Sequence, residues 1–214
     1  ACIDFGDPEV IELVQSSIPV VTIDYLFNNR IAIMSDNVTG MKELLEYIYS
    51  RGHRKIAYIH GAMSAVTSGR LSSFYRTAER LGLEMPDEYI REAAYRDTTT
   101  TYRVTNELLD LPDPPTCIIY PDDFASFGGI NAIRQRGLQI PEDISVAGYD
   151  GIQAARQLEP RLTTVQQDTE QIGCLAAREL ISLIERPKTT IIEQVIVPGK
   201  VAEGKSVARI PTDN

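Results

Sequence analysis

Residues 141–150 read PEDISVAGYD, and residues 162–168 read LTTVQQD. The first stretch has the pattern of a buried strand that ends in a carboxylate, Asp150, and the second contains the next strand along the chain. Parallel α/β sheets bind ligands where their strands end at the carboxyl edge, and an Asp at that edge accepts hydrogen bonds from ligand hydroxyl groups. The two stretches therefore predict a ligand-binding edge in a parallel α/β fold.

Apolar runs alternate with amphipathic helical patterns along the rest of the chain, which predicts parallel sheets flanked by helices. Strands are expected at residues 1–5, 18–23, 31–34, 56–60, 89–95, 116–120, 144–149, 190–197 and 201–207. Helices are expected after Asp7, from 35–37 to about 50, and at 68–81, 101–109, 123–137 (capped by Asp123) and 168–184.

Composition and charge narrow the function classes. The chain has 214 residues, 43% of them hydrophobic and 24% charged, which is typical of a globular protein of one or two compact units. A net charge of -9 disfavours direct contact with DNA phosphates, and no apolar run is long enough to span a membrane. No signal peptide is recognisable, so we expect a cytoplasmic location. Because residue 1 is Ala, the chain is a processed product, a fragment or part of a larger protein.

Few residues suggest catalysis or metal binding. Cys2, Cys117 and Cys174 are far apart and are expected to be buried free thiols in a reducing cytosol. The only two histidines, His53 and His60, are not close to a cysteine, so neither a metal nor a cofactor is predicted. No nucleophile elbow, phosphate-binding loop or dinucleotide fingerprint is present, and the protein is predicted not to be an enzyme. Composition leaves paired carboxylates for glycoside hydrolysis open, although no local pattern supports them.

A series of motifs in a fixed order resembles the effector-binding core of the LacI/GalR family of transcription factors. The motifs are IPVVTID at 18–24, SDNVTG at 35–40, RGHRKIAYI at 51–59, SGRLSSF at 68–74, PTCIIYPDD at 115–123, and the two stretches quoted first. The resemblance covers nearly the whole chain.

The resemblance implies two Rossmann-like subdomains with parallel sheets, of the periplasmic-binding-protein-like type, joined by three crossovers near Ser35, Asp168 and Pro198. The N-terminal subdomain would comprise residues 1–34 plus 168–197 and would be incomplete. The C-terminal subdomain would comprise residues 35–167 plus 198–210. The DNA-binding headpiece is absent from this chain, and the effector would lie in the cleft between the subdomains.

The same resemblance assigns ligand-binding roles to Arg70, Asp150, Asp24 and Gln167. At a helix start, the guanidinium of Arg70 offers a planar fork of donors to ligand oxygens, although a surface salt bridge is the ordinary role of an arginine. The alternative for Asp150 is a helix or turn cap, for Asp24 a strand-end turn, and for Gln167 a hinge contact.

Two further positions carry ligand predictions. Asp122 occupies a place that is commonly Asn in the family, and a carboxylate there would favour ligand hydroxyls because it only accepts hydrogen bonds. Arg96, or its neighbour Tyr95, falls where some sugar-binding members stack an aromatic ring. Asp123 is interpreted as a helix N-cap rather than a ligand contact. Gly151 stands where the family often has a second Asp.

The function implied is that of the effector-sensing and dimerisation core of a bacterial transcriptional regulator. Its effector is a small molecule, with a sugar favoured, and operator DNA would bind through the missing headpiece. A homodimer is expected through Phe127 and Leu158, with core packing as the alternative for Phe127. The runner-up is a periplasmic sugar-binding protein of a transporter, and the third possibility is an enzyme that acts on sugars.

Overall fold

A computed structural model of the chain describes residues 7–27, 30–187, 191 and 193–211. The chain divides into two compact units, one formed by residues 1–36 and 168–198 and the other by residues 37–167 and 199–214. The predicted divisions after residues 34 and 197 differ from these by two residues and one residue. The predicted α/β class with mostly parallel sheets is confirmed.

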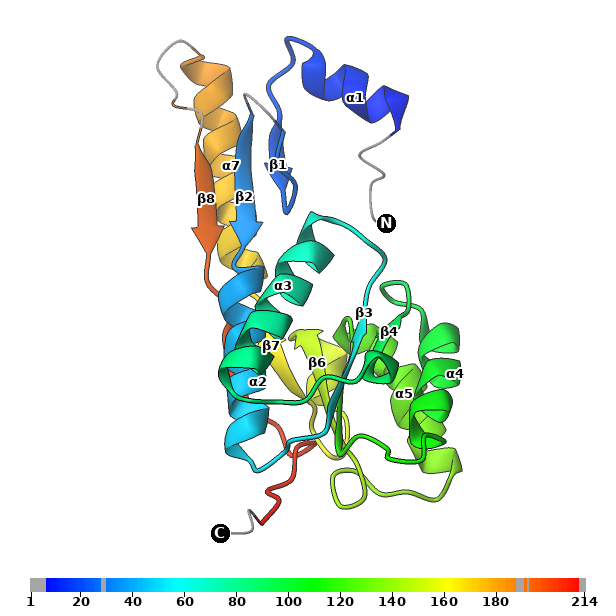
Figure 1. Cartoon of the computed structure of the whole chain (residues 1–214). Helices are drawn as coiled ribbons and strands as arrows, with labels where there is room; N and C mark the ends of the chain where they lie inside the picture. Colours follow the sequence, from blue (N-terminus) through cyan, green and yellow to red (C-terminus); the bar gives the residue numbers. More distant parts are fainter. Residues whose placement is uncertain (1–6, 28–29, 188–190, 192, 212–214) are drawn as a thin grey trace. The chain divides into compact units, whose positions relative to one another are not determined.

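The first unit contains a three-stranded parallel sheet in the order β1-β2-β8 (Figure 1). Its elements are α1 (Pro8–Gln15), β1 (Val21–Ile23), β2 (Ile31–Ser35), α7 (Thr169–Glu185) and β8 (Gln194–Val197). Its described core is small: among the residues that the structure describes, the buried cluster between the sheet and α7 consists of Ile31, Ile33, Ile172 and Val197.

The second unit contains a six-stranded sheet in the order β4-β3-β5-β6-β7-β9, in which only β9 runs antiparallel to its neighbour. Its strands are β3 (Ile56–His60), β4 (Ile90–Glu92), β5 (Cys117–Ile119), β6 (Ser145–Asp150), β7 (Thr163–Gln166) and β9 (Lys200–Ala202). Its helices are α2 (Asn37–Ser50), α3 (Ala65–Arg80), α4 (Thr98–Leu109), α5 (Asp123–Gln135) and α6 (Gln153–Arg156), with a 3-10 turn at Asp87–Tyr89.

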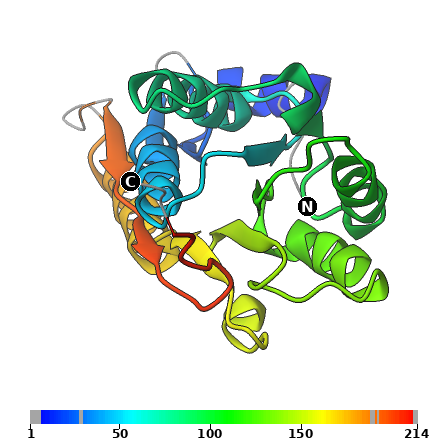
Figure 2. The same ribbon diagram turned by 60° about the horizontal axis from the view of Figure 1, so that its bottom comes forward.

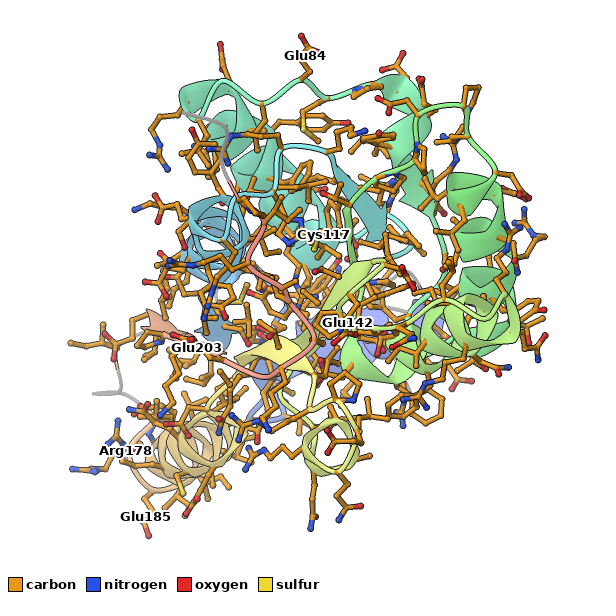
Figure 3. The ribbon with its side chains drawn as sticks, turned by 90° about the horizontal axis from the view of Figure 1, so that it is seen from below. Glu84, Cys117, Glu142, Arg178, Glu185 and Glu203 are labelled. Carbon is orange, nitrogen blue, oxygen red and sulfur yellow. The ribbon has the colours of Figure 1, made fainter. Side chains whose placement is uncertain are left out.

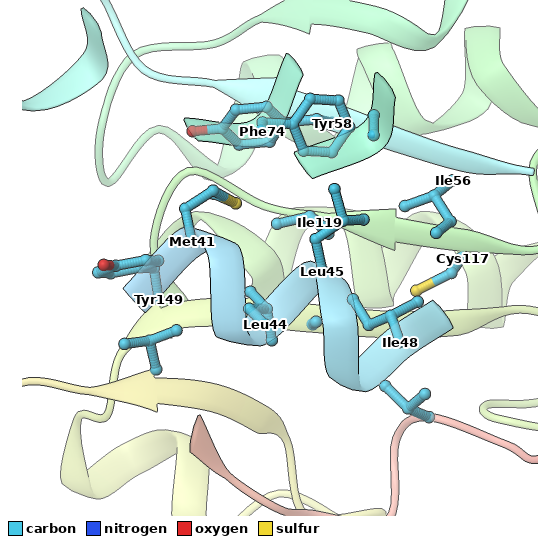
Figure 4. Close-up of a cluster of buried hydrophobic side chains, with 14 of the residues drawn as sticks. Met41, Leu44, Leu45, Ile48, Ile56, Tyr58, Phe74, Cys117, Ile119 and Tyr149 are labelled. Atoms are coloured by element: carbon cyan, nitrogen blue, oxygen red, sulfur yellow. The ribbon is translucent and has the colours of Figure 1, made fainter. Parts of the chain in front are cut away.

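Helices cover both faces of this sheet, α2 and α3 on one side and α4 and α5 on the other (Figures 1 and 2). Alternation along β3 explains the two layers, because successive side chains of a strand point to opposite faces. Ile56 and Tyr58 join the cluster under α2 and α3 (Figure 4), whereas Ala57 and Ile59 join the one under α4 and α5. Burial on both faces explains why the strands read as continuous apolar runs.

Several predicted elements are corrected. The strand expected at 201–207 ends at Ala202, because Gly204, Ser206 and Ala208 bond to loop and strand groups of the sheet instead of forming a ladder. The strand expected at 89–95 is limited to β4, and the following loop passes through a positive φ of 61° at Arg96.

Other corrections concern helix starts and cysteines. Helix α3 begins at Ala65 rather than 68, because the Ser64 hydroxyl caps it by accepting from Thr67 N at 3.1 Å. Cys117 is buried inside the sheet, as expected (Figure 3). The labelled Glu84 in the same view lies, by contrast, at the outer edge of the ribbon. Cys174 is exposed, which corrects the prediction. It lies two residues from the buried Ile172 and so on the other side of α7.

Cys2 and the strand expected at residues 1–5 lie outside the described residues, as do 190 and 192 of the strand expected at 190–197. No described helix combines the length and apolar character needed to cross a membrane.

Candidate functional site

The carboxyl ends of β3, β5, β6 and β7 meet at one edge of the six-stranded sheet, because these strands are parallel. The register pairs Asp150 with Gln166, so that Asp150 and Gln167 leave the sheet side by side. The second unit therefore brings together five residues of the predicted ligand-binding set: Arg70, Arg96, Asp122, Asp150 and Gln167.

The Arg70 side chain is a buried cation and does not present its donors at the surface. Only 3% of the residue is exposed. Its Nε donates to Asn37 Oδ1 at 2.8 Å, its Nη1 donates to the Pro121 carbonyl at 2.9 Å, and its guanidinium lies 3.5 Å from the centre of the Tyr149 ring. These contacts join the starts of α2 and α3 to the end of β5. The Nη2 atom remains directed at Asp150 Oδ1, 3.7 Å away.

Burial alone would lower the pKa of the Arg70 guanidinium, but Tyr149, Tyr95 and Asp150 reverse that effect and the net pKa is raised. Arg70 therefore stays charged. A buried charge of this kind is tolerated only where hydrogen bonds and partners compensate for its lost hydration.

Asp150 presents the accessible carboxylate of the site. Its side chain is 36% exposed, and Oδ1 accepts a hydrogen bond from Gln167 Nε2 at 2.6 Å. Its φ of 107° is unusual for a non-glycine residue, and Gly151 follows with a φ of 75°. A Cβ at position 151 would lie 2.7 Å from Gln166 Cα, which explains why this loop has glycine rather than a second Asp.

Asp122 has a mainly structural environment. It is 2% exposed, its Oδ1 accepts from Ala125 N at 2.7 Å, and its Oδ2 accepts from Arg96 N at 2.7 Å. Asp122 is therefore the N-cap of α5, and the expectation that Asp123 caps this helix is wrong by one residue. The cap requires extended backbone, which Asp122 has, whereas Asp123 is already helical.

Asp123 is a buried carboxyl group whose environment the sequence did not reveal. It is 0% exposed and accepts from Thr164 Oγ1 at 2.6 Å and from Ile152 N at 2.8 Å. Burial raises its pKa to about 7, and the charge of Asp150 acts in the same direction. Asp123 thus ties the start of α5 to β7 and to the loop that follows Asp150. The only signal in the sequence is the adjacent pair of acids, which does not distinguish their roles.

The aromatic ring expected at position 95 or 96 is that of Tyr95, and it lies at the carboxyl edge of the six-stranded sheet. A Cβ on Gly61 would lie 2.2 Å from the Tyr95 ring, so the ring packs directly on the backbone at position 61. The Tyr95 hydroxyl is 2.8 Å from Thr67 Oγ1, which in turn donates to the Ala62 carbonyl. The Arg96 side chain is exposed, and its guanidinium lies 5.5 Å from the centre of the Phe124 ring.

Tyr58 was not anticipated as part of the site. Its ring is buried, and its hydroxyl has no hydrogen-bond partner within the described residues. Burial raises its pKa, an effect that the charge of Arg70 opposes. The Arg70 guanidinium lies 3.5 Å from the centre of the Tyr149 ring and 5.9 Å from that of Tyr95, whereas its link to Tyr58 is electrostatic. An isolated tyrosine in an apolar run carries no sequence signal for such a role.

Asp24 belongs to the first unit. Its Oδ1 accepts from Ser35 N at 2.6 Å and its Oδ2 accepts from Ser35 Oγ at 3.0 Å, which joins the ends of β1 and β2. Its φ is 53°. Among the described residues, Asp24, Arg96 and Asp150 are the non-glycine positions with positive φ, and all three are predicted ligand contacts. Backbone strain of this kind concentrates at functional sites.

The predicted interface residues also lie in the second unit. Phe127 is half-buried on α5, with its ring centre 5.6 Å from that of Phe124, which is 40% exposed. Leu158 is half-buried and packs against the cluster under α4 and α5. Within the described residues, no group of acidic, histidine and cysteine side chains could hold a metal ion.

Comparison with known proteins gives a consistent family. Residues 45–207 match the model of the periplasmic binding protein-like domain. The chain is 31% identical over 212 residues to the probable HTH-type transcriptional repressor ExuR of Bacillus subtilis (strain 168), covering 98% of this chain and 63% of the relative. It is 34% identical over 168 residues to the HTH-type transcriptional repressor PurR of Serratia proteamaculans (strain 568), covering 77% of this chain and 48% of that relative. The chain thus spans about half to two thirds of these relatives.

Solved structures share the fold. A putative LacI transcriptional regulator from Bacillus cereus subsp. cytotoxis NVH 391-98 superposes with a TM-score of 0.87 at 26% identity, over 95% of this chain and 73% of that one. A LacI family regulator from Enterococcus faecium with bound ribose has a TM-score of 0.85 at 23% identity, over 96% and 77% of the two chains. The CelR–cellobiose complex has a TM-score of 0.84 at 23% identity, over 94% and 62%.

Proposed function

Because the chain belongs to the periplasmic binding protein-like domain family, in the form found in LacI-type transcriptional regulators, we propose that it senses the effector of a bacterial transcriptional regulator. The effector is a sugar that binds at the carboxyl edge of the six-stranded sheet. Its binding shifts the population of conformations of the whole regulator and so changes operator affinity. Operator contact would be made in the cytoplasm by a part of the protein outside this chain.

One observation carries the proposal of a ligand at this edge. Asp150 is a strand-end carboxylate that is 36% exposed, held in a strained conformation, and oriented by Gln167 and Arg70. Such a group accepts hydrogen bonds from sugar hydroxyls, while the neighbouring ring of Tyr95 offers an apolar face to a sugar ring. Two regulators of the same fold were solved with ribose and with cellobiose, which supports a sugar here.

In this arrangement Asp150 contacts the ligand, and Arg70 and Gln167 position its carboxylate. Asp122 acts through Arg96, whose N–H it accepts. Asp24 of the first unit stays a predicted ligand contact, with its carboxylate bonded to Ser35. Because Arg70 is already bonded to Asn37 and Pro121, we assign it a positioning role rather than the direct contact expected from the sequence.

A binding screen tests the proposal. The chain is titrated by calorimetry with neutral monosaccharides and disaccharides and with their acidic and phosphorylated derivatives. We expect at least one sugar to bind, and Asp150→Asn to weaken it about tenfold or more, since a hydrogen bond to a charged group contributes roughly 1.5–3 kcal/mol. Glu142→Gln, which neutralises an exposed carboxylate before β6, is the matched control and should leave affinity unchanged. Binding of no sugar, or unchanged affinity in Asp150→Asn, would contradict the proposed site.

We also propose that the full regulator is a homodimer through Phe127 and Leu158. Light scattering of the full-length gene product carrying Phe127→Asp and Leu158→Asp is the test, with Tyr75→Asp, an exposed aromatic on α3, as control. Loss of the dimer in the first two variants is expected, and a dimer that persists in both places the interface elsewhere.

The gene itself gives a second test, because a helix-turn-helix coding region upstream supports a regulator whereas a signal peptide supports a transport protein.

A further inference from the structure

Arg96 has an exposed cation without a protein partner at the candidate site. Its guanidinium forms no hydrogen bond or ion pair with any residue in the described part of the chain, and its one ring contact is with Phe124 at 5.5 Å. Arg136 of the same unit is engaged, by contrast, because it pairs with both carboxylate oxygens of Asp110 at 2.8 Å. The five donors of the Arg96 guanidinium are therefore available to a ligand.

The backbone holds Arg96 in place at some cost. Its φ of 61° lies in the left-handed region, which a non-glycine residue adopts only when its surroundings enforce it. The enforcing contact is the buried carboxylate of Asp122, which accepts Arg96 N–H at 2.7 Å and caps α5 with its other oxygen. A buried acid thus holds the backbone of Arg96 in the loop between β4 and α4 (Figure 1).

The surroundings suit an anion. Arg96 directly follows Tyr95, whose ring packs on Gly61 at the carboxyl edge of the sheet. Asp150, the accessible carboxylate of the site, has its Oδ1 3.7 Å from Arg70 Nη2, so its charge is partly balanced within the protein. Asp122 is 2% exposed and directs its oxygens to backbone N–H groups. An anionic substituent beside Arg96 would therefore meet a free guanidinium rather than a free carboxylate.

We propose that the effector is a sugar that carries an oxyanion, either a carboxylate or a phosphate, and that Arg96 binds this group beside Tyr95. A guanidinium fork matches both groups through two parallel charge-assisted hydrogen bonds. The inference rests on the proposed sugar site and refines it by naming the charged group that the sugar carries. Asp122 is a positioning residue in this arrangement.

The test compares matched ligands on the intact chain by calorimetry. Glucose is compared with glucuronate and glucose 6-phosphate, and galactose with galacturonate and galactose 6-phosphate. We expect one acid or one phosphate to bind about tenfold or more tightly than its neutral parent, as for one charge-assisted pair. Arg96→Gln should remove that difference in affinity between the anionic and the neutral sugar, and Arg96→Lys should restore part of it. A preference for the acid identifies a carboxylate, and a preference for the phosphate identifies a phosphate.

Arg209→Gln is the matched control, because Arg209 is another exposed arginine of the same unit and lines a different pocket with Ser50 and Gly52. It should keep the preference. Equal affinity for the neutral and anionic sugars, or a preference that survives Arg96→Gln, would overturn the inference while the sugar site stands. Absence of binding by sugars of either kind would instead overturn the proposed function on which the inference rests.

Discussion

At the scale of single residues, Arg70 illustrates how a buried charge is accommodated. Its surroundings supply an amide oxygen from Asn37, the carbonyl of Pro121 and the face of Tyr149, so the cost of removing a cation from water is met by good geometry. The contact with Asp150 adds little to stability, because that side chain is one-third exposed and 3.7 Å away.

We therefore predict that Arg70→Ala lowers the free energy of unfolding by about 3–5 kcal/mol, since it leaves a cavity beside Tyr149 and removes the buried donors that Asn37 Oδ1 and the Pro121 carbonyl accept from. Urea unfolding followed by circular dichroism measures the loss. Arg76→Ala, on the exposed side of the same helix, should stay within about 0.5 kcal/mol of the parent. Similar stability of the two variants would show that Arg70 is not structurally required.

Asp123 gives the chain a pH dependence whose sign follows from its burial. Its pKa is about 7 in the folded chain against an ordinary value of 3.8, so the folded chain keeps this proton to a higher pH than the unfolded chain does. The stability that this group contributes is therefore full below pH 4, falls as the pH rises from about 4 to 7, and is constant above. His53 acts in the opposite direction, because burial lowers its pKa to about 4 and the folded chain loses stability as the pH falls from 6.5 to 4.

We predict that Asp123→Asn is at least as stable as the parent at pH 8, because an amide in that place can accept from Ile152 N and donate to Thr164 without carrying a charge. The difference in unfolding free energy between variant and parent should shrink, or change sign, as the pH falls from 8 to 4.5. Taking this difference cancels the titration of His53. Parallel pH profiles of the two proteins would rule out Asp123 as the titrating group.

At the scale of elements, residues 203–210 fasten the second sheet by side-chain bonds rather than as a strand. Ser206 is 1% exposed, its hydroxyl accepts from Thr163 N at 2.8 Å and donates to the Val146 carbonyl at 2.7 Å, and it thereby joins β6 to β7. Further along, Ala208 N donates to Ser145 Oγ, and the Ala208 carbonyl lies 3.3 Å from His53 Nε2.

Ser206→Ala should accordingly lower the free energy of unfolding by about 1–3 kcal/mol, because two buried backbone groups lose their partner. The urea midpoint reports the change, and Ser68→Ala on the exposed side of α3 serves as the comparison. A midpoint unaltered by Ser206→Ala would mean that the backbone bond from Val146 N to Ser206 O is sufficient to hold the segment.

The elements that could be predicted from the sequence are those whose pattern alone decides their burial. The two-faced apolar run at 56–60 and the strand that ends at Asp150 are examples, since central parallel strands are apolar throughout. What could not be predicted depends on contacts distant in the sequence. A strand is expected at 201–207, but Ser206 finds its partners on β6 and β7 instead. The adjacent acids Asp122 and Asp123 fit the same capping pattern, and only the folded loop decides between them.

At the scale of the whole molecule, the two units differ in the size of their cores. In the first unit four buried residues form the cluster under α7, and large apolar side chains such as Ile181, Ile184 and Ile196 are more than half exposed. The second unit has two clusters of 15 and 14 buried residues on the two faces of its sheet. Burial of apolar surface is the main favourable term in folding, so the two units should differ in local stability.

We predict that amide hydrogens in the second unit exchange only on global unfolding, whereas those of the first unit exchange through easier local opening. Exchange measured on one sample of the chain compares residues 21–23 of β1 with residues 145–147 of β6, after correction for intrinsic rates. The amides of β6 should be protected at least about a hundredfold more, which corresponds to a difference in opening free energy of about 3 kcal/mol. The bond from Asp24 N to the Ile33 carbonyl, at 2.9 Å, is an internal check, because it should open together with β1 and not with β6. Equal protection of the two strands would mean that the small cluster under α7 suffices to hold the first unit as firmly as the two larger clusters hold the second.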